Sequence, residues 1–367
     1  MKCGLIRFSA VLVWGILPAY LLQGEATYQI QPVSLPGASR VLVIDINNGG
    51  TITGAETLND GTDTSVVFQL GKEPTVVNPV VGDWRGGATY INSLGVAVGN
   101  SQGTDPKLVV MHAIKWSPSN GTQALSTPVG WYSQAGGIND QGMAVGSIGD
   151  QRNIQWPEAA VWDAQGNITI LPQYLGASQI NNHGQIIVDD WSNDYLLTPG
   201  SNPAVIVGLG GGNVSTMGLT DAGVIVGRSL TLAGRYHAFL STSPETAIDL
   251  TPGADCDTVA IDINSYDQVI GYIDGRGSSI PTDGFLYENG QLSDLLSLAG
   301  ASAQGWNYLY PTAINDNGWI VGNGVYNGVW QSFLMTPVTG NSAAPEPASL
   351  AILGVGLSEL LAARRRN

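Results

Sequence analysis

One phrase recurs seven times along the 367-residue chain, and it restricts the fold more than any other feature. Each copy has an apolar residue, then Asn-Asp/Asn-x-Gly or a close variant, then a β-branched run such as VAVG, VIVG or WIVG. The first residue of this turn motif, the anchor, lies at Asn47, Asn92, Asn139, Asn181, Thr220, Asn264 and Asn315. Consecutive anchors are separated by 45, 47, 42, 39, 44 and 51 positions. Such a period indicates an array of small units that bury their apolar faces against one another.

The order of residues within each unit predicts strands. The glycine after the anchor suits a tight turn with positive φ, and the β-branched run that follows is typical of a strand. A second apolar strand follows in most units, such as AAVWD at Ala159 or HAFLS at His237, and then a third, such as GNITIL at Gly166. Three or four short strands in a unit of this length are typical of a propeller blade. The fold predicted for residues 27–340 is therefore an all-β, seven-bladed β-propeller.

The first and last units predict how the ring closes. The segment YQIQPVSLPG from Tyr28 matches the strand that ends each unit, whereas the last unit stops at FLMTPVTG and lacks that strand. We therefore expect the N-terminal strand to complete the seventh blade, which would hide two open strand edges.

Residues 1–26 have the pattern of a signal peptide. Lys2 and Arg7 precede an apolar stretch from Phe8 to Leu22, and small residues follow, so we expect cleavage after Ala26. The chain is therefore expected to be exported.

The C-terminal segment, residues 341–367, has three parts in order. Pro345, Glu346 and Pro347 precede an apolar run at 348–363, which precedes Arg364, Arg365 and Arg366. A helix over the apolar run would span roughly 24 Å, close to a hydrocarbon core, with the arginines on the cytoplasmic side.

This tail resembles the PEP-CTERM sorting signal of Gram-negative bacteria that make exopolysaccharide. The resemblance implies an exosortase-like processing enzyme as partner, a transient transmembrane helix at 348–363 in the inner membrane, and release to the cell surface or outside. Glu359 inside the apolar run departs from the pattern. An unprocessed C-terminal anchor is the alternative.

The repeat resembles the HAF-type extracellular repeat of bacterial surface proteins over about residues 28–338. The signature word is complete only at His237-Ala238-Phe239, and blade four departs most, with Asp189 where we place the glycine of other units. The resemblance implies an extracellular location and implies no chemistry.

The charge balance excludes some partners. The chain has a net charge of −15, and with the terminal segments set aside the body holds about −17. Such a body repels nucleic acids and anionic lipid, so we expect no nucleic-acid partner.

We find no catalytic, cofactor or metal-ligating constellation in the sequence. His112 and His237 share one repeat position, which indicates a structural role, and no histidine or cysteine spacing is typical of a metal site. Most carboxylates are explained by the repeat: Asp140, Asp221 and Asp316 in the turns, and Asp45 and Asp262 two residues before their anchors. The acids of DDWSND, Asp189, Asp190 and Asp194, are the least explained. We therefore expect no cofactor and no metal.

Three tryptophans are candidates for a ligand-binding face. Trp84, Trp131 and Trp306 each lie eight or nine residues before an anchor, in the connections between blades. Aromatic rings with polar neighbours can stack on sugars or on partner side chains. The alternative is packing between blades.

These observations favour an exported, non-enzymatic binding protein of the cell surface or the exopolysaccharide matrix, with exopolysaccharide or another envelope protein as its partner. A carbohydrate-active hydrolase or lyase on a propeller scaffold is the alternative, because fold does not determine function. Two carboxylates in an asymmetric central cluster would favour the enzyme. A channel lined by repeat-equivalent backbone would favour the binding protein.

Overall fold

The computed structural model describes residues 28–105, 108, 110–274 and 283–338. The expected signal peptide and the PEP-type tail, with Pro345, Glu346, Pro347 and Arg364 to Arg366, lie outside these residues. No helix among the described residues is long and apolar enough to cross a membrane.

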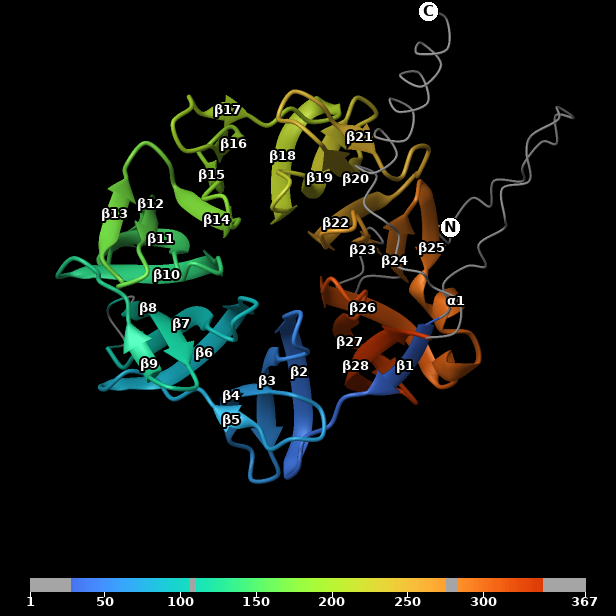
Figure 1. The fold of residues 1–367 in the computed structure, drawn as a ribbon, viewed down its shortest axis with the longest axis horizontal. Coiled ribbons are helices and arrows are strands. Elements are labelled where there is room, and N and C mark those ends of the chain that lie inside the picture. The colour runs from blue at the N-terminus through green and yellow to red at the C-terminus, as the bar shows by residue number, and fades with distance from the viewer. Residues whose placement is uncertain (1–27, 106–107, 109, 275–282, 339–367) are drawn as a thin grey trace, which may run out of the picture.

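In the described part of the chain, 28 strands form seven four-stranded antiparallel sheets arranged as the blades of a propeller (Figure 1). The predicted all-β, seven-bladed propeller is thus confirmed. Blade 1 comprises β2 (Ala38–Ile46), β3 (Ile52–Leu58), β4 (Asp63–Phe68) and β5 (Thr75–Val76), and blade 2 comprises β6 (Asp83–Ile91), β7 (Ala97–Gly103), β8 (Met111–Ser117) and β9 (Gly121–Ala124). Blade 3 comprises β10 (Trp131–Ile138), β11 (Ala144–Asp150), β12 (Asn153–Trp162) and β13 (Ile168–Leu171), and blade 4 comprises β14 (Gly176–Ile180), β15 (Ile186–Asp189), β16 (Asp194–Leu197) and β17 (Ala204–Val205). Blade 5 comprises β18 (Gly210–Leu219), β19 (Ile225–Thr231), β20 (Tyr236–Ser241) and β21 (Ile248–Asp249), and blade 6 comprises β22 (Asp257–Ile263), β23 (Val269–Asp274), β24 (Asp283–Glu288) and β25 (Gln291–Asp294). Blade 7 comprises β26 (Trp306–Ile314), β27 (Ile320–Tyr326), β28 (Val329–Pro337) and β1 (Tyr28–Pro32).

The N-terminal strand closes the ring as the sequence predicts. β1 pairs antiparallel with β28, from Tyr28 opposite Pro337 to Pro32 opposite Phe333. Two short helical segments, α1 (Leu295–Ala299) and a 3₁₀ turn at Gly300–Ala303, connect blades 6 and 7 beside β1. The Ser302 hydroxyl accepts the Ile30 N–H at 3.1 Å, so this connection also holds the closing strand in place.

Each turn at an anchor needs positive φ three residues later. Gly50 has φ 73° and the equivalent glycines of five other blades are similar, whereas blade 6 has Asp267 at φ 60°. Left-handed backbone favours glycine and tolerates aspartate, which explains both choices.

A second repeated glycine lets the first two strands of a blade approach closely. A Cβ at Gly99 would lie 1.9 Å from the Gly87 carbonyl oxygen, and five other blades have the same close approach. In blade 4 the strand pairing places Val188 at this position, opposite Ala177, so our assignment of Asp189 to it is wrong by one residue. The error arose because this unit has no glycine to align.

The apolar core lies between neighbouring blades. One cluster, for example, joins Val66 and Phe68 of blade 1 to Val321 and Leu334 of blade 7. Seven such clusters of buried residues occur in the described chain, so every blade depends on its neighbours for burial.

The order of strands defines two faces of the ring. The innermost strand of each blade ends at its anchor turn, so all anchor turns lie on one face, the anchor face. The turns between second and third strands, and the connections between blades, lie on the opposite face.

Candidate functional site

The anchor side chains form a chain of hydrogen bonds around the propeller axis. Each buried anchor asparagine donates its Nδ2–H to the carbonyl oxygen of the next blade's anchor, at 2.9–3.1 Å. The bond from Asn315 to Asn47 crosses the closure between blades 7 and 1. Thr220 in blade 5 has no amide to donate toward Asn264, so six of seven links are present among these anchors.

The same side chains also fix their own turns. The Asn92 Oδ1 accepts the N–H groups of Leu94 at 3.1 Å and Val96 at 2.9 Å. A single buried amide therefore shapes the turn and joins two blades, which explains why the residue is asparagine.

A second polar layer lies one residue after the anchors. Asp140 accepts the Ser93 N–H at 2.9 Å, and Asp316 accepts the Ser265 N–H at 2.8 Å. The Asn182 amide bonds to both Asp140 and Asp221, at 3.1 and 3.0 Å. These carboxylates act as links between neighbouring blades.

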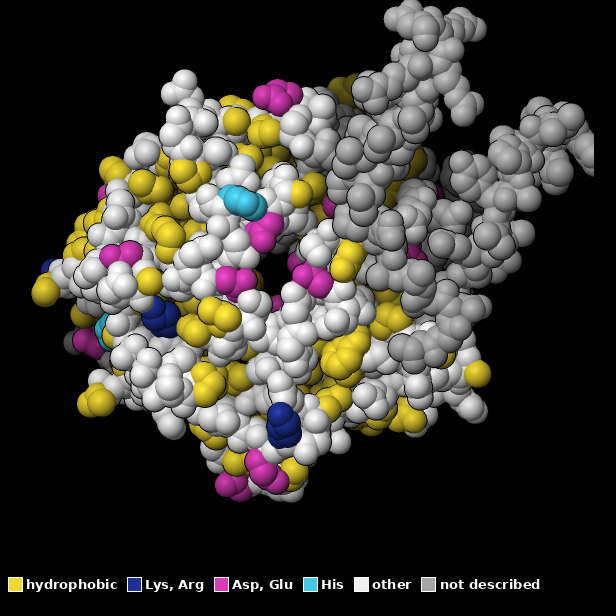
Figure 2. All heavy atoms as spheres, viewed as in Figure 1, with side chains coloured by type: hydrophobic (Ala, Val, Ile, Leu, Met, Phe, Trp, Pro, Cys, Tyr) yellow, Lys and Arg dark blue, Asp and Glu magenta, His cyan; other side chains and the backbone are white. Residues whose placement is uncertain are grey.

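The two layers enclose an axial pocket of about 230 Å³ on the anchor face. Figure 2 shows this face, with carboxylate side chains around the central opening. Aliphatic residues alternate with amides and acids on its wall, which is formed by Ile46, Asn47, Asn48, Ile91, Ser93, Asp140, Thr220, Asp221, Ile263, Asn264, Ser265, Ile314, Asn315 and Asp316. The wall suits a small polar ligand or ordered water more than an apolar ligand.

Two further carboxylates lie near the axis but are not among the residues that line the pocket. Asp45 accepts the N–H of Ile91 in the next blade at 2.9 Å, and Asp262 accepts the N–H of Ile314 at 2.8 Å. The second oxygen of each accepts the N–H of the following residue in its own strand. Only blades 1 and 6 have an acid at this repeat position.

Burial raises the pKa of both groups. The pKa of Asp45 rises to about 6, and that of Asp262 rises to about 7, where the charge of Asp45 adds to the effect of burial. Burial and the charges of the same two acids raise the pKa of Tyr90. The centre of the ring thus combines repeat-equivalent anchors with an asymmetric acid pair, and the two features favour different functions.

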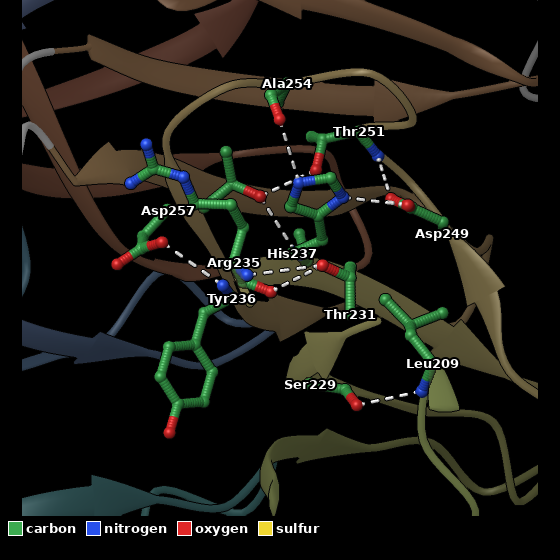
Figure 3. Close-up of polar contacts among 12 residues, drawn as sticks. Leu209, Ser229, Thr231, Arg235, Tyr236, His237, Asp249, Thr251, Ala254 and Asp257 are labelled. Atoms are coloured by element: carbon green, nitrogen blue, oxygen red, sulfur yellow. Dashed lines mark hydrogen bonds and ion pairs between the residues drawn. The ribbon is translucent and has the colours of Figure 1, made fainter. Parts of the chain in front are cut away.

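The histidines at the shared repeat position pair with carboxylates. His112 Nδ1 lies 2.9 Å from Asp83, and His237 Nδ1 lies 2.8 Å from Asp249. Figure 3 shows that the other ring nitrogen of His237 faces the Ala254 carbonyl oxygen, at 3.1 Å. Both nitrogens of His237 face acceptors, and the ring joins β20 and β21 to the connection toward blade 6. This arrangement agrees with a structural role.

The acids of the DDWSND segment have separate positions. Asp190 accepts the Ser192 and Asn193 N–H groups and the Tyr195 hydroxyl, which closes the β15–β16 turn. Asp194 accepts both the N–H and the hydroxyl of Thr216 in blade 5, at 2.8 Å. Burial and the charges of Asp194 and Asp190 raise the pKa of Asp189 to about 6. No group of His, Cys, Asp or Glu among the described residues is arranged to hold a metal ion.

The three candidate tryptophans begin the innermost strands of their blades, but their environments differ. Trp84 is 58% exposed and Trp131 is half-buried, whereas Trp306 is only 7% exposed. The Trp306 ring packs on Tyr326 and Phe333, with centroids 5.0 and 5.7 Å apart. Trp306 therefore contributes to the core between blades and is not presented to a ligand.

A different pair of tryptophans is exposed on the face opposite the anchor turns. Trp156 near the start of β12 is 61% exposed, and Trp191 in the β15–β16 turn is 69% exposed. Their ring centroids lie 5.5 Å apart, with the planes at 78°. The repeat pattern does not predict this pair, because its members lie in different blades at different repeat positions. The departure of blade 4 from the repeat was the one sequence feature that indicated an unusual surface near Trp191.

No protein-family model matches the sequence, and no curated protein is significantly similar to it. Among solved structures, the chain is similar to the propeller domain of the Trilobed protease from Pyrococcus furiosus, with a TM-score of 0.53 and 10% sequence identity. The match covers 84% of this chain and 100% of that domain, which is described as having an open velcro topology. The Pyrococcus horikoshii acylaminoacyl peptidase has a TM-score of 0.49 and 10% identity over 83% of this chain, which spans about half (54%) of that peptidase. At 10% identity, the likeness to the propeller domain of the Trilobed protease shows the propeller fold alone.

Proposed function

We propose that this chain is an exported, non-enzymatic binding protein of the cell surface or the exopolysaccharide matrix, delivered by its C-terminal tail. The scaffold is a closed ring, and the two ends of the sequence have the patterns of an export signal and a sorting signal. An exosortase-like enzyme is the expected processing partner.

One observation supports binding over catalysis more than any other. Five carboxylates surround the axis: Asp45, Asp140, Asp221, Asp262 and Asp316. Every oxygen of these five groups accepts a hydrogen bond from the ring itself. Carboxylates that are held in this way contribute to the joints between blades, and the pocket wall has no nucleophile paired with a base.

The first experiment follows the protein in its native Gram-negative host. We expect the full chain to be released into the matrix fraction with a mass that lacks the tail. A variant with Pro345→Ala and Pro347→Ala should remain in the inner membrane at its larger mass. Equal release of the variant, or wild-type protein confined to the cytoplasm, would contradict the proposal.

The alternative function, a carbohydrate-active hydrolase or lyase, is favoured by the acid pair Asp45 and Asp262. Carboxyl groups whose pKa is raised by burial are common among general acids. The test is the chain length of matrix polysaccharide after incubation with purified protein, with the double variant Asp45→Asn and Asp262→Asn as comparison. Shortening by wild type but not by the variant would establish the enzyme, and unchanged length with wild type would favour the binding protein.

A further inference from the structure

The exposed pair Trp156 and Trp191 is unusual for the surface of this protein. Large apolar side chains exposed singly are ordinary, but two tryptophans exposed in mutual contact form a joint apolar surface. The two rings come from adjacent blades, so the surface bridges blades 3 and 4. Neither ring packs in the cluster of buried residues between these blades.

The backbone that presents Trp191 is held firmly. Asp190 Oδ1 accepts the N–H groups of Ser192 at 2.6 Å and Asn193 at 2.8 Å, and its other oxygen accepts the Tyr195 hydroxyl at 2.7 Å. The Tyr195 ring packs in turn on Tyr174, with centroids 5.5 Å apart. An exposed ring on a fixed turn loses little conformational freedom when it binds a ligand, which favours affinity.

The chemistry around the rings indicates the class of ligand. The turn around Trp191 is polar, with Asp190, Ser192 and Asn193, and the protein as a whole has a net charge of −15. An anionic polymer would be repelled by this charge, and an apolar partner would displace water from the polar side chains of the turn without offering them hydrogen bonds. A neutral sugar has C–H groups on one ring face and hydroxyls at its edge, so it matches an indole face with polar neighbours.

We infer that Trp156 and Trp191 form a subsite for a neutral sugar unit of a polysaccharide. This inference rests on the proposed function and specifies where and what the protein binds. The perpendicular rings present two differently oriented surfaces, one to stack on a sugar face and one to contact its side. The subsite lies on the face opposite the axial pocket, so the pocket and the subsite are independent.

Affinity electrophoresis of the full chain tests the inference with defined probes. Native gels contain hydroxyethyl cellulose or galactomannan as neutral polymers, and alginate as the anionic polymer. We expect neutral polymer to retard wild type, and Trp156→Ala or Trp191→Ala to weaken the apparent affinity about tenfold or more. Leu232→Ala is the matched control, because Leu232 is 87% exposed in the corresponding turn of blade 5. It should bind as wild type does.

The outcomes separate the two proposals. If a neutral polymer retards wild type and both tryptophan variants equally, the subsite is wrong while the binding function stands. If only alginate retards wild type, the assignment of a neutral sugar is wrong. If no polymer retards wild type, both the subsite and the polysaccharide-binding function are contradicted. Thermal melting of each variant verifies that the ring remains folded.

Discussion

An anchor asparagine has all four of its polar groups in use at once: its backbone N–H, its backbone carbonyl, its Oδ1 and its Nδ2. Asn92 receives the Asn47 amide on its carbonyl oxygen, holds its own turn through Oδ1, and donates to Asn139. The side chain is only 5% exposed, so the loss of any of these bonds leaves a buried polar group unpaired. At this scale, one asparagine side chain both joins two blades and forms its own turn.

The role of the anchor hydrogen bonds can be tested by adding the one between blades 5 and 6 that Thr220 lacks. In Thr220→Asn, the new amide is placed to donate to the Asn264 carbonyl oxygen while its Oδ1 accepts the Val224 N–H that the threonine hydroxyl accepts now. We expect the free energy of unfolding to rise by roughly 0.5–1.5 kcal/mol, and Asn92→Ala to lower it by roughly 2–4 kcal/mol. Urea denaturation measures both. A destabilised Thr220→Asn protein would contradict the role given to the anchors.

The raised pKa of Asp262 predicts a pH dependence with a definite sign. The pKa of this carboxyl is about 7 in the folded protein, whereas an aspartate in the unfolded chain loses its proton near pH 3.8. Its contribution to stability is therefore full at low pH and is lost as the pH rises toward 7. One such proton gives a slope of at most about 1.4 kcal/mol per pH unit.

Asp262→Asn should remove this slope, so its unfolding free energy should fall less steeply than that of wild type between pH 5 and pH 7. Asp163→Asn is the control. Hydrogen bonds from Asn167 lower the pKa of Asp163, so this group stays ionised over that range. Identical pH profiles for wild type and Asp262→Asn would show that Asp262 is ionised in the folded ring.

At the scale of strands and turns, the β15–β16 hairpin is the element that departs most from the repeat. Its turn depends on Asp190, and we expect Asp190→Ala to loosen the presentation of Trp191 and weaken retardation by neutral polymer about threefold to tenfold. The unfolding midpoint should change little, since Asp190 is only half-buried and lies in a surface turn. Asp60→Ala is the matched control, because Asp60 accepts the Thr62 N–H in the corresponding turn of blade 1, which has no tryptophan. If the two variants bind neutral polymer with equal affinity, the turn at Asp190 does not contribute to binding.

Elements of the fold differed in how well the sequence predicted them. The anchor turns, the strands and the closing strand follow from local patterns that repeat, so they were predicted correctly. The burial of Trp306 depends on contacts with Tyr326 and Phe333 further along the chain, and no spacing rule distinguishes it from Trp84. The contact of Trp156 with Trp191 joins two units that are neighbours only once the ring is assembled, so it could not be predicted.

For the whole molecule, the central claim is that seven units form a closed ring whose last blade is completed by the first strand. Closure allows the anchor bonds to continue from Asn315 to Asn47, and it buries Tyr28 and Ile30 against blade 7. A closed ring has no unpaired strand edge between its first and last blades, where another chain could otherwise pair.

Hydrogen–deuterium exchange of the full chain, followed by mass spectrometry, tests closure most directly. We expect the amides of Tyr28–Pro32 that face β28 to be protected, and to lose protection at the same urea concentration as those of Val329–Pro337. Rapid exchange of the N-terminal peptide while the other blades remain protected would contradict the closed ring.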